Sequence, residues 1–549
     1  MPLAATLIPD EGKGPLKLRN RAVRAALYTQ RGARALAIAA AIIAATRNAG
    51  AAPQPDRPKL DRALWQAADL PANADVIEVI VRVNGADLAA MRTRLEARGH
   101  RIINEHPSVG AFAVALHGAD LRDLEGDPSV LHISANAIVA AHADGSDSTG
   151  GRGTAARQAL VTTLGLATAT VSGKGAGVAV LDSGIAPGAE LTPDAFYDFT
   201  RGGRRSEPYD DYGHGTHVSG LIAGRSSGVA PSARVIGLKV LDAHGQGTIS
   251  TVLQALEFAI VNRQRLGIDV VNLSLGHVAT ERAADDPLVQ AVECATRAGL
   301  IVVTSAGNAV APPDGTRYAE ISSPGTAPSA ITVGAFDTHH TSTRLDDDVA
   351  EYSAHGPTPF DGFQKPDIVA PGHDLVSTAA VDSVLYTQYP ERQVLDDHGR
   401  ARLFRLSGSS MAAAVTSGVV ALLVEQNRRE SDARLTPNLA KAMLQFSSLS
   451  IPGDPLTRGA GALNGGGALD LAASIDPSYP TGEWSAPRMP TPVTTIDSEH
   501  DVWSQTIIWG TTIIWGTAVY VNEPAWSTAT VWGSTIIWGT TIIWGTAVQ

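Results

Sequence analysis

The sequence predicts an α/β protein in which a parallel sheet carries helices on both faces. The first observation is an alternation after residue 159, with strands expected at 234–241, 269–275, 300–305 and 330–336 and helices at 249–265, 286–299 and 410–427. Such alternation is typical of parallel strands joined by crossover helices. The second is the run Gly177 to Leu181, which is apolar without polar alternation, as in a strand buried on both sides.

A different order of elements precedes this core. Strands are expected at 75–83, 101–103, 111–116 and 130–134, and helices at 87–98 and 119–125. The order β-α-β-β-α-β is that of a ferredoxin-like α+β domain, which we place at 72–142. An independent binding domain is one interpretation of it. The Pro- and charge-rich residues 53–71 and the Gly-, Ser- and Asp-rich residues 143–158 are expected to be linkers.

The N-terminal segment has the pattern of an export signal. Basic residues at 13–34 precede the apolar run 35–45 and the small residues Ala49-Gly50-Ala51. This order predicts a secretory signal peptide at 1–52. The apolar run is shorter than the about 20 residues that a membrane-spanning helix needs. We therefore expect a secreted or cell-envelope-associated protein, with an uncleaved amphipathic or anchoring helix as the alternative.

Charge and cysteine content narrow the function further. The first 50 residues hold eight Lys/Arg and two Asp/Glu, so the total net charge of −12 leaves −18 on the remainder. An acidic surface repels phosphates, which argues against a nucleic-acid partner. The single cysteine, Cys294, excludes an intrachain disulfide. It is expected to be a small buried residue on a helix.

Three short segments carry the residues of nucleophilic catalysis. They are Asp182-Ser183-Gly184, His214-Gly215-Thr216-His217 and Gly408-Ser409-Ser410-Met411-Ala412. A carboxylate that orients an imidazole, which in turn removes a hydroxyl proton, makes serine a nucleophile. Asp182 follows the buried strand, where α/β sheets bind ligands. Ser410 begins an apolar helix, whose free N–H groups favour a nearby oxyanion.

These motifs resemble the signatures of subtilisin-type (S8) serine peptidases, in the family's Asp…His…Ser order. The resemblance covers roughly residues 159–475 and is strengthened by further segments, which are Val270–Gly276, Ser305-Ala306-Gly307-Asn308, Tyr352–Pro357 and Lys365–Gly372. One departure is Ala414, where the family usually has proline. Since alanine is a good helix former, we expect a small effect on helix entry and none on chemistry.

The resemblance implies roles for particular residues. Asp182, His214 and Ser410 would form the catalytic triad, and Asn308 would supply the oxyanion-hole amide. Extended substrates would bind along Ser274-Leu275-Gly276 and Ala306-Gly307. The domain at 72–142 resembles an inhibitor-type prodomain, so the chain would inhibit itself until residues 135–158 are cleaved. The peptidase domain would span 159–476.

Other roles were weighed for several of these side chains. His214 and His217 share a helix face, but the spacing is not that of a zinc site, so no metal is assigned. Ser409 is expected to cap the helix that Ser410 begins. Asp346-Asp347-Asp348 offers carboxylates for a structural calcium ion, although no cofactor is required. The remaining histidines of loop-like sequence are expected at the surface; they are His244, His277, His355 and His373.

The C-terminal region contains a repeat of six residues. A Pro-, Thr- and Ser-rich stretch, assigned as linker 477–502, precedes Thr506-Ile507-Ile508-Trp509-Gly510-Thr511, which recurs at 512–517, 535–540 and 541–546. Because six is even, each repeat on a strand shows the same residues to the same face. The tail at 503–549 therefore has two interpretations. It contacts the cell envelope or a polymer through its tryptophans, or it forms strands that pair with each other or pack on the catalytic domain.

Together these patterns predict a secreted serine endopeptidase, made as a self-processing zymogen, that cleaves peptide and protein substrates through an acyl-enzyme. The alternative is an envelope-attached binding protein whose peptidase domain acts only on its own propeptide. The sequence does not identify the residue after which either protein would cleave, because loop conformation shapes the specificity pocket.

Overall fold

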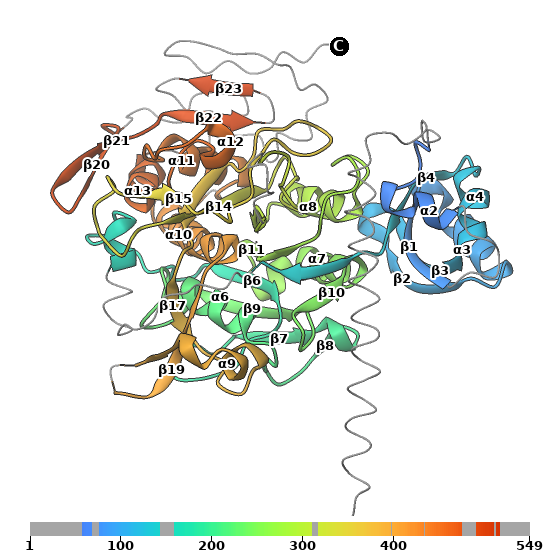
Figure 1. The fold of residues 1–549 in the computed structure, drawn as a ribbon, viewed down its shortest axis with the longest axis horizontal. Helices are drawn as coiled ribbons and strands as arrows, with labels where there is room; N and C mark the ends of the chain where they lie inside the picture. The colour runs from blue at the N-terminus through green and yellow to red at the C-terminus, as the bar shows by residue number, and fades with distance from the viewer. Residues whose placement is uncertain are drawn as a thin grey trace, which may run out of the picture. The chain divides into compact units, whose positions relative to one another are not determined.

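The computed structural model describes residues 57–68, 76–142, 159–309, 317–396, 398–432, 434–474, 490–509 and 512–515. Figure 1 shows its elements in chain order. The predicted signal peptide at 1–52, the predicted linker at 143–158 and the repeats at 535–546 lie outside the described residues.

The N-terminal elements form a four-stranded antiparallel sheet with two helices. They are β1 (Val76–Val83), α3 (Leu88–Ala97), β2 (Arg101–His106), β3 (Ala111–His117), α4 (Gly118–Glu125) and β4 (Val130–Ala135), with sheet order β2-β3-β1-β4. The order β-α-β-β-α-β is the one expected. Val79, Val81, Met91 and Leu121 belong to one apolar core between sheet and helices. This unit therefore has its own hydrophobic core.

The predicted linker at 53–71 is partly wrong. Its second half forms a 3₁₀ turn (Arg62–Leu64) and the short helix α2 (Trp65–Ala68). Leu60, Leu64 and Ala68 are buried in the same core, and Leu60 bridges to Ile133 of β4. Proline and charge in this stretch suggested a linker, but three spaced apolar residues were enough to anchor it.

The central sheet has nine strands in the order β15-β14-β13-β11-β6-β9-β7-β8, with β16 also paired to β14. Its strands are β6 (Gly177–Asp182), β7 (Ala195–Asp198), β8 (Arg204–Arg205), β9 (Arg234–Lys239), β11 (Val270–Leu273), β13 (Ile301–Ser305), β14 (Ile331–Asp337), β15 (Asp348–Val349) and β16 (Ile368–Pro371). All pairings are parallel except those of β8 and β15. The predicted parallel sheet is thus confirmed, with short antiparallel strands added.

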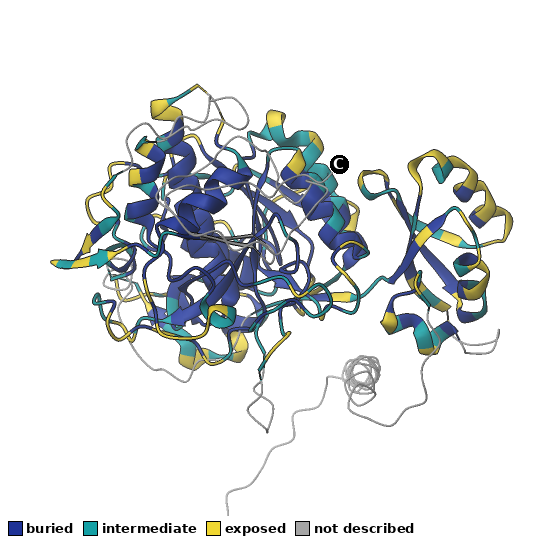
Figure 2. Ribbon diagram, turned by 90° about the horizontal axis from the view of Figure 1, so that it is seen from above, coloured by how far each residue is buried: buried dark blue, intermediate teal, exposed yellow. Residues whose placement is uncertain are grey.

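Helices cover both faces of this sheet. The helices of this part of the chain are α6 (His214–Ala223), α7 (Ile249–Leu266), α8 (Pro287–Arg297), α9 (Val384–Gln388), α10 (Ser409–Glu430), α11 (Pro437–Phe446), α12 (Pro455–Arg458) and α13 (Gly465–Ser474), of which the short α9 and α12 are not part of this cover. Along β6, Val178 and Val180 enter the core shared with α6 and α10, whereas Ala179 and Leu181 enter the core shared with α7 and α8. The strands are accordingly buried on both sides, as Figure 2 shows in dark blue.

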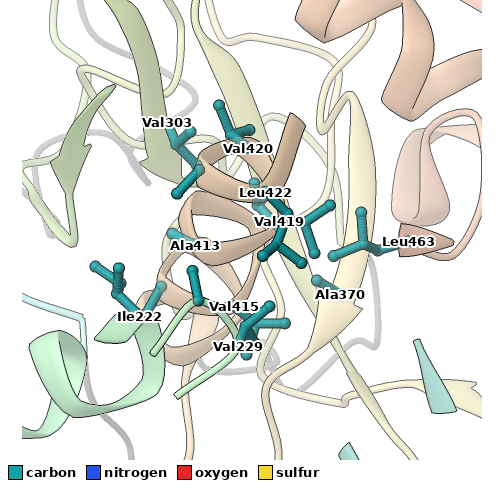
Figure 3. Close-up of a cluster of buried hydrophobic side chains, with 14 of the residues drawn as sticks. Ile222, Val229, Val303, Ala370, Ala413, Val415, Val419, Val420, Leu422 and Leu463 are labelled. Atoms are coloured by element: carbon teal, nitrogen blue, oxygen red, sulfur yellow. The ribbon is translucent and has the colours of Figure 1, made fainter. Parts of the chain in front are cut away.

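Helix α10 is the centre of one core. Figure 3 shows its residues Ala413, Val415, Val419 and Val420 surrounded by side chains from other elements, among them Ile222 of α6. Within the described residues, α10 is also the one helix long and apolar enough to cross a membrane, but 94% of that apolar window is buried inside the protein. Its apolar character is therefore explained by the core it forms.

Two smaller sheets lie beside the central one. One has the order β10-β5-β12, formed by β5 (Ile138–Ala141), β10 (Gln246–Thr248) and β12 (Leu275–Gly276). The other has the order β17-β19-β18, formed by β17 (Leu375–Thr378), β18 (Gln393–Leu395) and β19 (Ala401–Leu406). The first joins a strand of the N-terminal region to two strands of the predicted peptidase domain.

The predicted linker at 477–502 is also partly wrong. Its last residues form a hairpin of β20 (Val493–Ile496) and β21 (Glu499–Val502). The next residue, Trp503, is 2% exposed and packs edge-on against Phe446 of α11. Its indole Nε1 donates to Thr494 Oγ1 at 2.8 Å. Composition suggested a linker, but the apolar side chains at its end anchor the hairpin.

The first two hexapeptide repeats pair with each other. β22 (Thr506–Trp509) and β23 (Thr512–Trp515) are antiparallel, with Ile507 opposite Ile514 and Ile508 opposite Ile513. Because these two strands are antiparallel, the first two repeats do not continue as one strand with a shared face. This arrangement is one of the two that the sequence left open for the tail.

Candidate active site

The acid and the imidazole of the predicted triad are hydrogen-bonded. Asp182 is the last residue of β6, and His214 is the first residue of α6. His214 Nδ1 lies 2.8 Å and 2.9 Å from the two carboxylate oxygens of Asp182, and both side chains are buried. A carboxylate only accepts, so Nδ1 carries the proton. This leaves Nε2, on the far side of the ring, as the basic nitrogen.

Asp210 orients the loop and helix that carry this pair. Its carboxylate accepts hydrogen bonds from the Ser183 hydroxyl at 2.9 Å, from Gly213 N at 2.8 Å, and from Thr216 N and Oγ1 at 2.9 and 2.6 Å. The sequence analysis did not identify Asp210. A carboxylate just before the helix that begins at His214 is nevertheless a recognisable signal, since it can bind free N–H groups there.

Gly213 is required where the chain enters α6. Its φ of 108° lies in the left-handed region, and a Cβ atom there would be 2.4 Å from Ser383 Oγ. Glycine alone combines that backbone angle with that close approach. The His-Gly-Thr-His helix therefore begins at a fixed place relative to the loop that holds Ser383.

Ser410 lies in the first turn of α10, but its hydroxyl is not hydrogen-bonded to the imidazole. Ser410 Oγ donates to the main-chain oxygen of Ser274 at 3.0 Å, and Ser274 Oγ donates to the main-chain oxygen of Ser410 at 3.0 Å. In the described part of the chain His214 Nε2 is buried without a hydrogen-bond partner. The His–Ser hydrogen bond of the expected triad is thus not formed, because the hydroxyl is satisfied by a carbonyl instead.

Asn308 sits beside the start of α10 with its amide aimed into the cleft. Its Oδ1 accepts from Ser409 N at 3.0 Å, and its Nδ2 donates to the main-chain oxygen of His142 at 3.2 Å. Because Oδ1 is occupied by an N–H donor, Nδ2 must face the opposite side, where a substrate carbonyl would lie. The Asn308 amide therefore faces the end of the segment 138–142.

The predicted capping role of Ser409 is wrong. The helix N-cap is Gly408, and Ser409 Oγ donates to Asn308 Oδ1 at 2.9 Å and accepts from Gly307 N at 3.2 Å. Its hydroxyl therefore links α10 to the loop after β13. Proximity in sequence suggested a cap, but the Ser409 oxygen accepts from Gly307 N, a donor distant in sequence, instead of from a helix N–H.

An extended segment fills the cleft along the predicted substrate residues. β5 pairs antiparallel with β12, where Leu275 is opposite Ala141 and Gly276 is opposite Ala140. Leu275 and Gly276 thus make the backbone contacts expected of a substrate-binding edge, and Ser274 contacts Ser410. Within the described residues, Ala306 and Gly307 make no backbone hydrogen bond to 138–142; Gly307 supports Ser409 instead.

The opposite wall of the cleft was not predicted. β10 pairs with the other edge of β5, with Gln246 opposite Ala140, Gly247 opposite Val139 and Thr248 opposite Ile138. In addition, Ala141 N donates to the main-chain oxygen of Gly245 at 3.2 Å. The sequence signal for this wall would have been the short Gly-containing segment that follows β9. It was not predicted because it carries no reactive side chain.

None of the residues weighed as metal ligands forms a metal site in the described residues. His217 Nε2 lies 3.1 Å from the main-chain oxygens of Leu375 and Phe404, and burial, followed by the neighbouring His214, lowers its pKa to about 3. Asp346 accepts from Thr341 Oγ1, while Asp347 pairs with the Arg344 guanidinium at 2.6 Å. Asp348 lies 3.4 Å from His339 Nε2, so the three consecutive carboxylates make separate contacts.

Two smaller expectations need correction. His277 is not a surface residue: its side chain is 7% exposed and its imidazole is close enough to lower the pKa of His142. Cys294 lies on α8 as expected but is only half-buried, and its Sγ contacts the main-chain oxygen of Ser108 in the N-terminal unit at 3.3 Å. In both cases the neighbour comes from a segment distant in sequence.

Comparisons with known proteins are consistent with this geometry. The model of the subtilase family, peptidase S8, matches residues 173–463. AprX, a serine protease of Bacillus subtilis, is 37% identical over 310 residues, which are 54% of this chain and 66% of that protein. An alkaline protease of Shouchella clausii is 30% identical over 387 residues, 69% of this chain and 86% of that protein.

A solved structure has the same fold. Fervidolysin from Fervidobacterium pennivorans, described as a keratinolytic enzyme related to subtilisin, superposes with a TM-score of 0.56 at 20% identity. The match covers 73% of this chain and 62% of that one. The chain thus spans somewhat less than two thirds of the length of AprX and of the fervidolysin chain.

Proposed function

The chain belongs to the subtilase family, and from this we propose that it is a serine endopeptidase that hydrolyses peptide bonds through Asp182, His214 and Ser410. The observation that supports this best is the buried pair of Asp182 and His214. An ionised carboxylate that accepts from Nδ1 leaves Nε2 free to act as a general base.

In the proposed mechanism His214 Nε2 removes the proton of Ser410 Oγ, after the hydroxyl rotates from Ser274 O towards the imidazole. Rotation about one side-chain bond between staggered positions suffices for this change. The alkoxide attacks the substrate carbonyl, and Asn308 Nδ2 with Ser410 N stabilises the oxyanion. His214 then passes the proton to the leaving amine, and water hydrolyses the acyl-enzyme in the reverse sequence of steps.

We further propose that residues 72–142 act as an inhibitory prodomain. Three groups of polar contacts join this unit to the peptidase domain. Ser108 N and Oγ donate to Glu257 at 3.0 and 2.7 Å, Asn104 Nδ2 donates to Ser250 Oγ at 2.7 Å, and His132 Nε2 lies 2.6 Å from Glu281. With β5 in the cleft, this interface blocks access to other substrates until cleavage.

Export is part of the same proposal. A peptidase with this domain order is inactive while its cleft is filled, which protects the cell that makes it. The basic, apolar and small segments of residues 13–51 support a secretory signal. A secreted enzyme would act on extended peptide segments, since the backbone contacts of β10 and β12 recognise any extended chain.

The test is a comparison of the full-length chain with its Ser410→Ala variant. The wild type is expected to process itself and then cleave an unstructured protein such as casein. Ser410→Ala is expected to remain full length, with turnover on added peptides lower by roughly 10⁶-fold, a magnitude taken from subtilisin itself. Equal thermal unfolding of the variant would exclude misfolding. Processing by Ser410→Ala would contradict the proposal, and self-processing without casein cleavage would restrict it to the propeptide.

A further inference from the structure

The segment in the cleft reaches the candidate oxyanion site at His142. Paired positions on both of its edges set its register, from Ile138 opposite Thr248 to Ala141 opposite Leu275. The next main-chain oxygen, that of His142, is the one that Asn308 Nδ2 binds at 3.2 Å. The carbonyl of His142 therefore occupies the place of a substrate carbonyl about to be attacked.

A different register is opposed by side-chain burial. Val139 has no exposed surface and packs in the core with Leu241 and Leu275. Because side chains alternate along a strand, a slip of one residue would remove Val139 from this pocket and place a different neighbour in it. The apolar pocket for Val139 and the amide of Asn308 lie near opposite ends of the segment 138–142. Both therefore favour the same register of this segment in the cleft.

The imidazole of His142 has its own recess. Nδ1 lies 2.9 Å from Ser305 Oγ at the end of β13, and Ser305 is fully buried. Gly276 forms the facing wall: a Cβ atom there would lie 2.6 Å from Cε1 of His142 and 2.5 Å from the main-chain oxygen of Ser323. The recess is therefore narrow enough for a planar ring and carries one hydroxyl to bind it.

The recess favours a neutral ring. Burial, with the imidazoles of His214 and His277, lowers the pKa of His142 to about 4. An apolar side chain at position 142 would leave the buried Ser305 hydroxyl without a hydrogen-bond partner, which costs free energy. A cationic side chain there would be disfavoured by burial and by the nearby imidazoles. The narrow shape of the recess and the hydroxyl of Ser305 together favour a neutral histidine side chain.

We propose that this chain cleaves itself after His142 and that Ser305 makes the primary specificity pocket selective for neutral, hydrogen-bonding side chains such as histidine. This inference rests on the proposed peptidase function and adds the bond and the specificity residue. The same preference would apply to substrates in trans, with a small apolar residue favoured three positions before the histidine, as Val139 occupies that place.

The chemical step balances as an ordinary peptide hydrolysis. Ser410 Oγ bonds to the carbonyl carbon of His142, its proton passes through His214 to the amide nitrogen of residue 143, and the carbon–nitrogen bond breaks. Water then adds to the ester carbon, its proton returns through His214 to Ser410 Oγ, and the ester bond breaks. The products are a fragment that ends in a His142 carboxylate and a chain that begins at Ala143.

The first test identifies the cleaved bond. The full-length chain is purified unprocessed under acid or inhibitor, processing is started, and intact masses are recorded from the earliest time points, before secondary trimming. The expected N-terminal fragment ends at His142 and the expected mature chain begins at Ala143. A first fragment that ends at any other residue, produced by wild type and absent with Ser410→Ala, would overturn this inference and leave the peptidase function intact. Cleavage in Ser410→Ala would overturn both.

The second test measures selectivity with a double-mutant cycle. His142→Leu is expected to slow cleavage at this bond at least about tenfold, because the Ser305 hydroxyl loses its partner. His142→Asn, whose side-chain amide reaches the position of Nδ1, is expected to recover part of the rate. In a Ser305→Ala background the effect of His142→Leu should shrink to about twofold. The exposed His398 provides the control, since His398→Leu should process at the wild-type rate.

The cycle remains informative if one variant folds poorly. Ser305→Ala alone removes a hydroxyl without adding volume, and its thermal unfolding in the Ser410→Ala background reports any structural defect. An undiminished effect of His142→Leu in the folded Ser305→Ala chain would show that Ser305 does not determine the specificity.

Discussion

Asn308 Nδ2 lies 3.2 Å from the main-chain oxygen of His142. This contact joins the loop after β13 to the end of the segment that fills the cleft. In the proposed mechanism the same amide would hold the oxyanion, since a carbonyl oxygen and the oxyanion formed from it occupy nearly the same place. The requirement for a donor here leads to the first prediction.

Replacing Asn308 by leucine is expected to lower kcat about 10²–10³-fold with little change in KM, because the donor acts mainly when charge develops on the oxygen. Steady-state kinetics on a chromogenic peptide measure this. Asn308→Asp is the matched variant: it keeps an acceptor for Ser409 N but lacks the donor, so it should be at least as inactive. Normal kcat in either variant would show that the amide is not a catalytic group.

Asp210 is expected to act as a positioning residue for His214. Asp210→Ala leaves the donors of Ser183, Gly213 and Thr216 without their acceptor, which should lower the free energy of unfolding by about 3 kcal/mol. Because His214 begins the same helix, kcat should fall while KM changes little. Asp210→Asn retains one carbonyl acceptor and should recover part of the free energy of unfolding and part of kcat. A loss of stability with unchanged kcat would assign Asp210 to the fold alone.

Binding of the 136–142 segment should weaken in acid. The pKa of His142 in the cleft, about 4, is below its ordinary value of about 6.5, so the bound segment holds fewer protons than the free one. The affinity of the segment for the cleft is therefore highest above about pH 6.5, and it decreases as the pH falls towards 4. The imidazoles of His214 and His277 lie close enough to influence His142, so the measurement requires a reference that shares both of them.

Two synthetic peptides of residues 136–142, one with His142 and one with leucine there, provide that reference. Their inhibition constants towards the processed enzyme are measured from pH 7 to pH 5, and their ratio cancels the titration of the enzyme. The relative affinity of the histidine peptide is expected to fall about tenfold or more over this range. A ratio independent of pH would contradict the assigned environment of His142.

The hairpin of β20 and β21 is expected to belong to the stable catalytic domain. Trp503→Ala removes a side chain that is 2% exposed and leaves a cavity against Phe446, at a cost of about 3–5 kcal/mol. Val502→Ala is the control, because Val502 is 61% exposed and its truncation should change stability by less than about 0.5 kcal/mol. Thermal unfolding in the Ser410→Ala background avoids self-digestion. If the two variants were equally stable, the hairpin would not contribute to the stability of the catalytic domain.

Local pattern was sufficient for the elements and for the chemistry they carry. The strand that ends at Asp182 and the helices that begin at His214 and Ser410 follow from apolar runs and small residues whose signal lies within a few positions. The failures share a cause. Residues 57–68 and 493–503 resemble linkers in composition, yet a few apolar side chains, such as Leu64 and Trp503, anchor them to distant surfaces.

The sequence by itself determined the α/β class, the order of the two folded units and the motifs that carry the three proposed triad residues, because each depends on periodicity or on a short motif. Only the tertiary structure decided which distant residues meet: that Ser410 Oγ donates to Ser274 O, and that His142 enters a recess lined by Ser305 and Gly276. Those contacts join positions up to 163 residues apart, and no local pattern records them, since they arise when parallel strands bring their carboxyl ends to one edge.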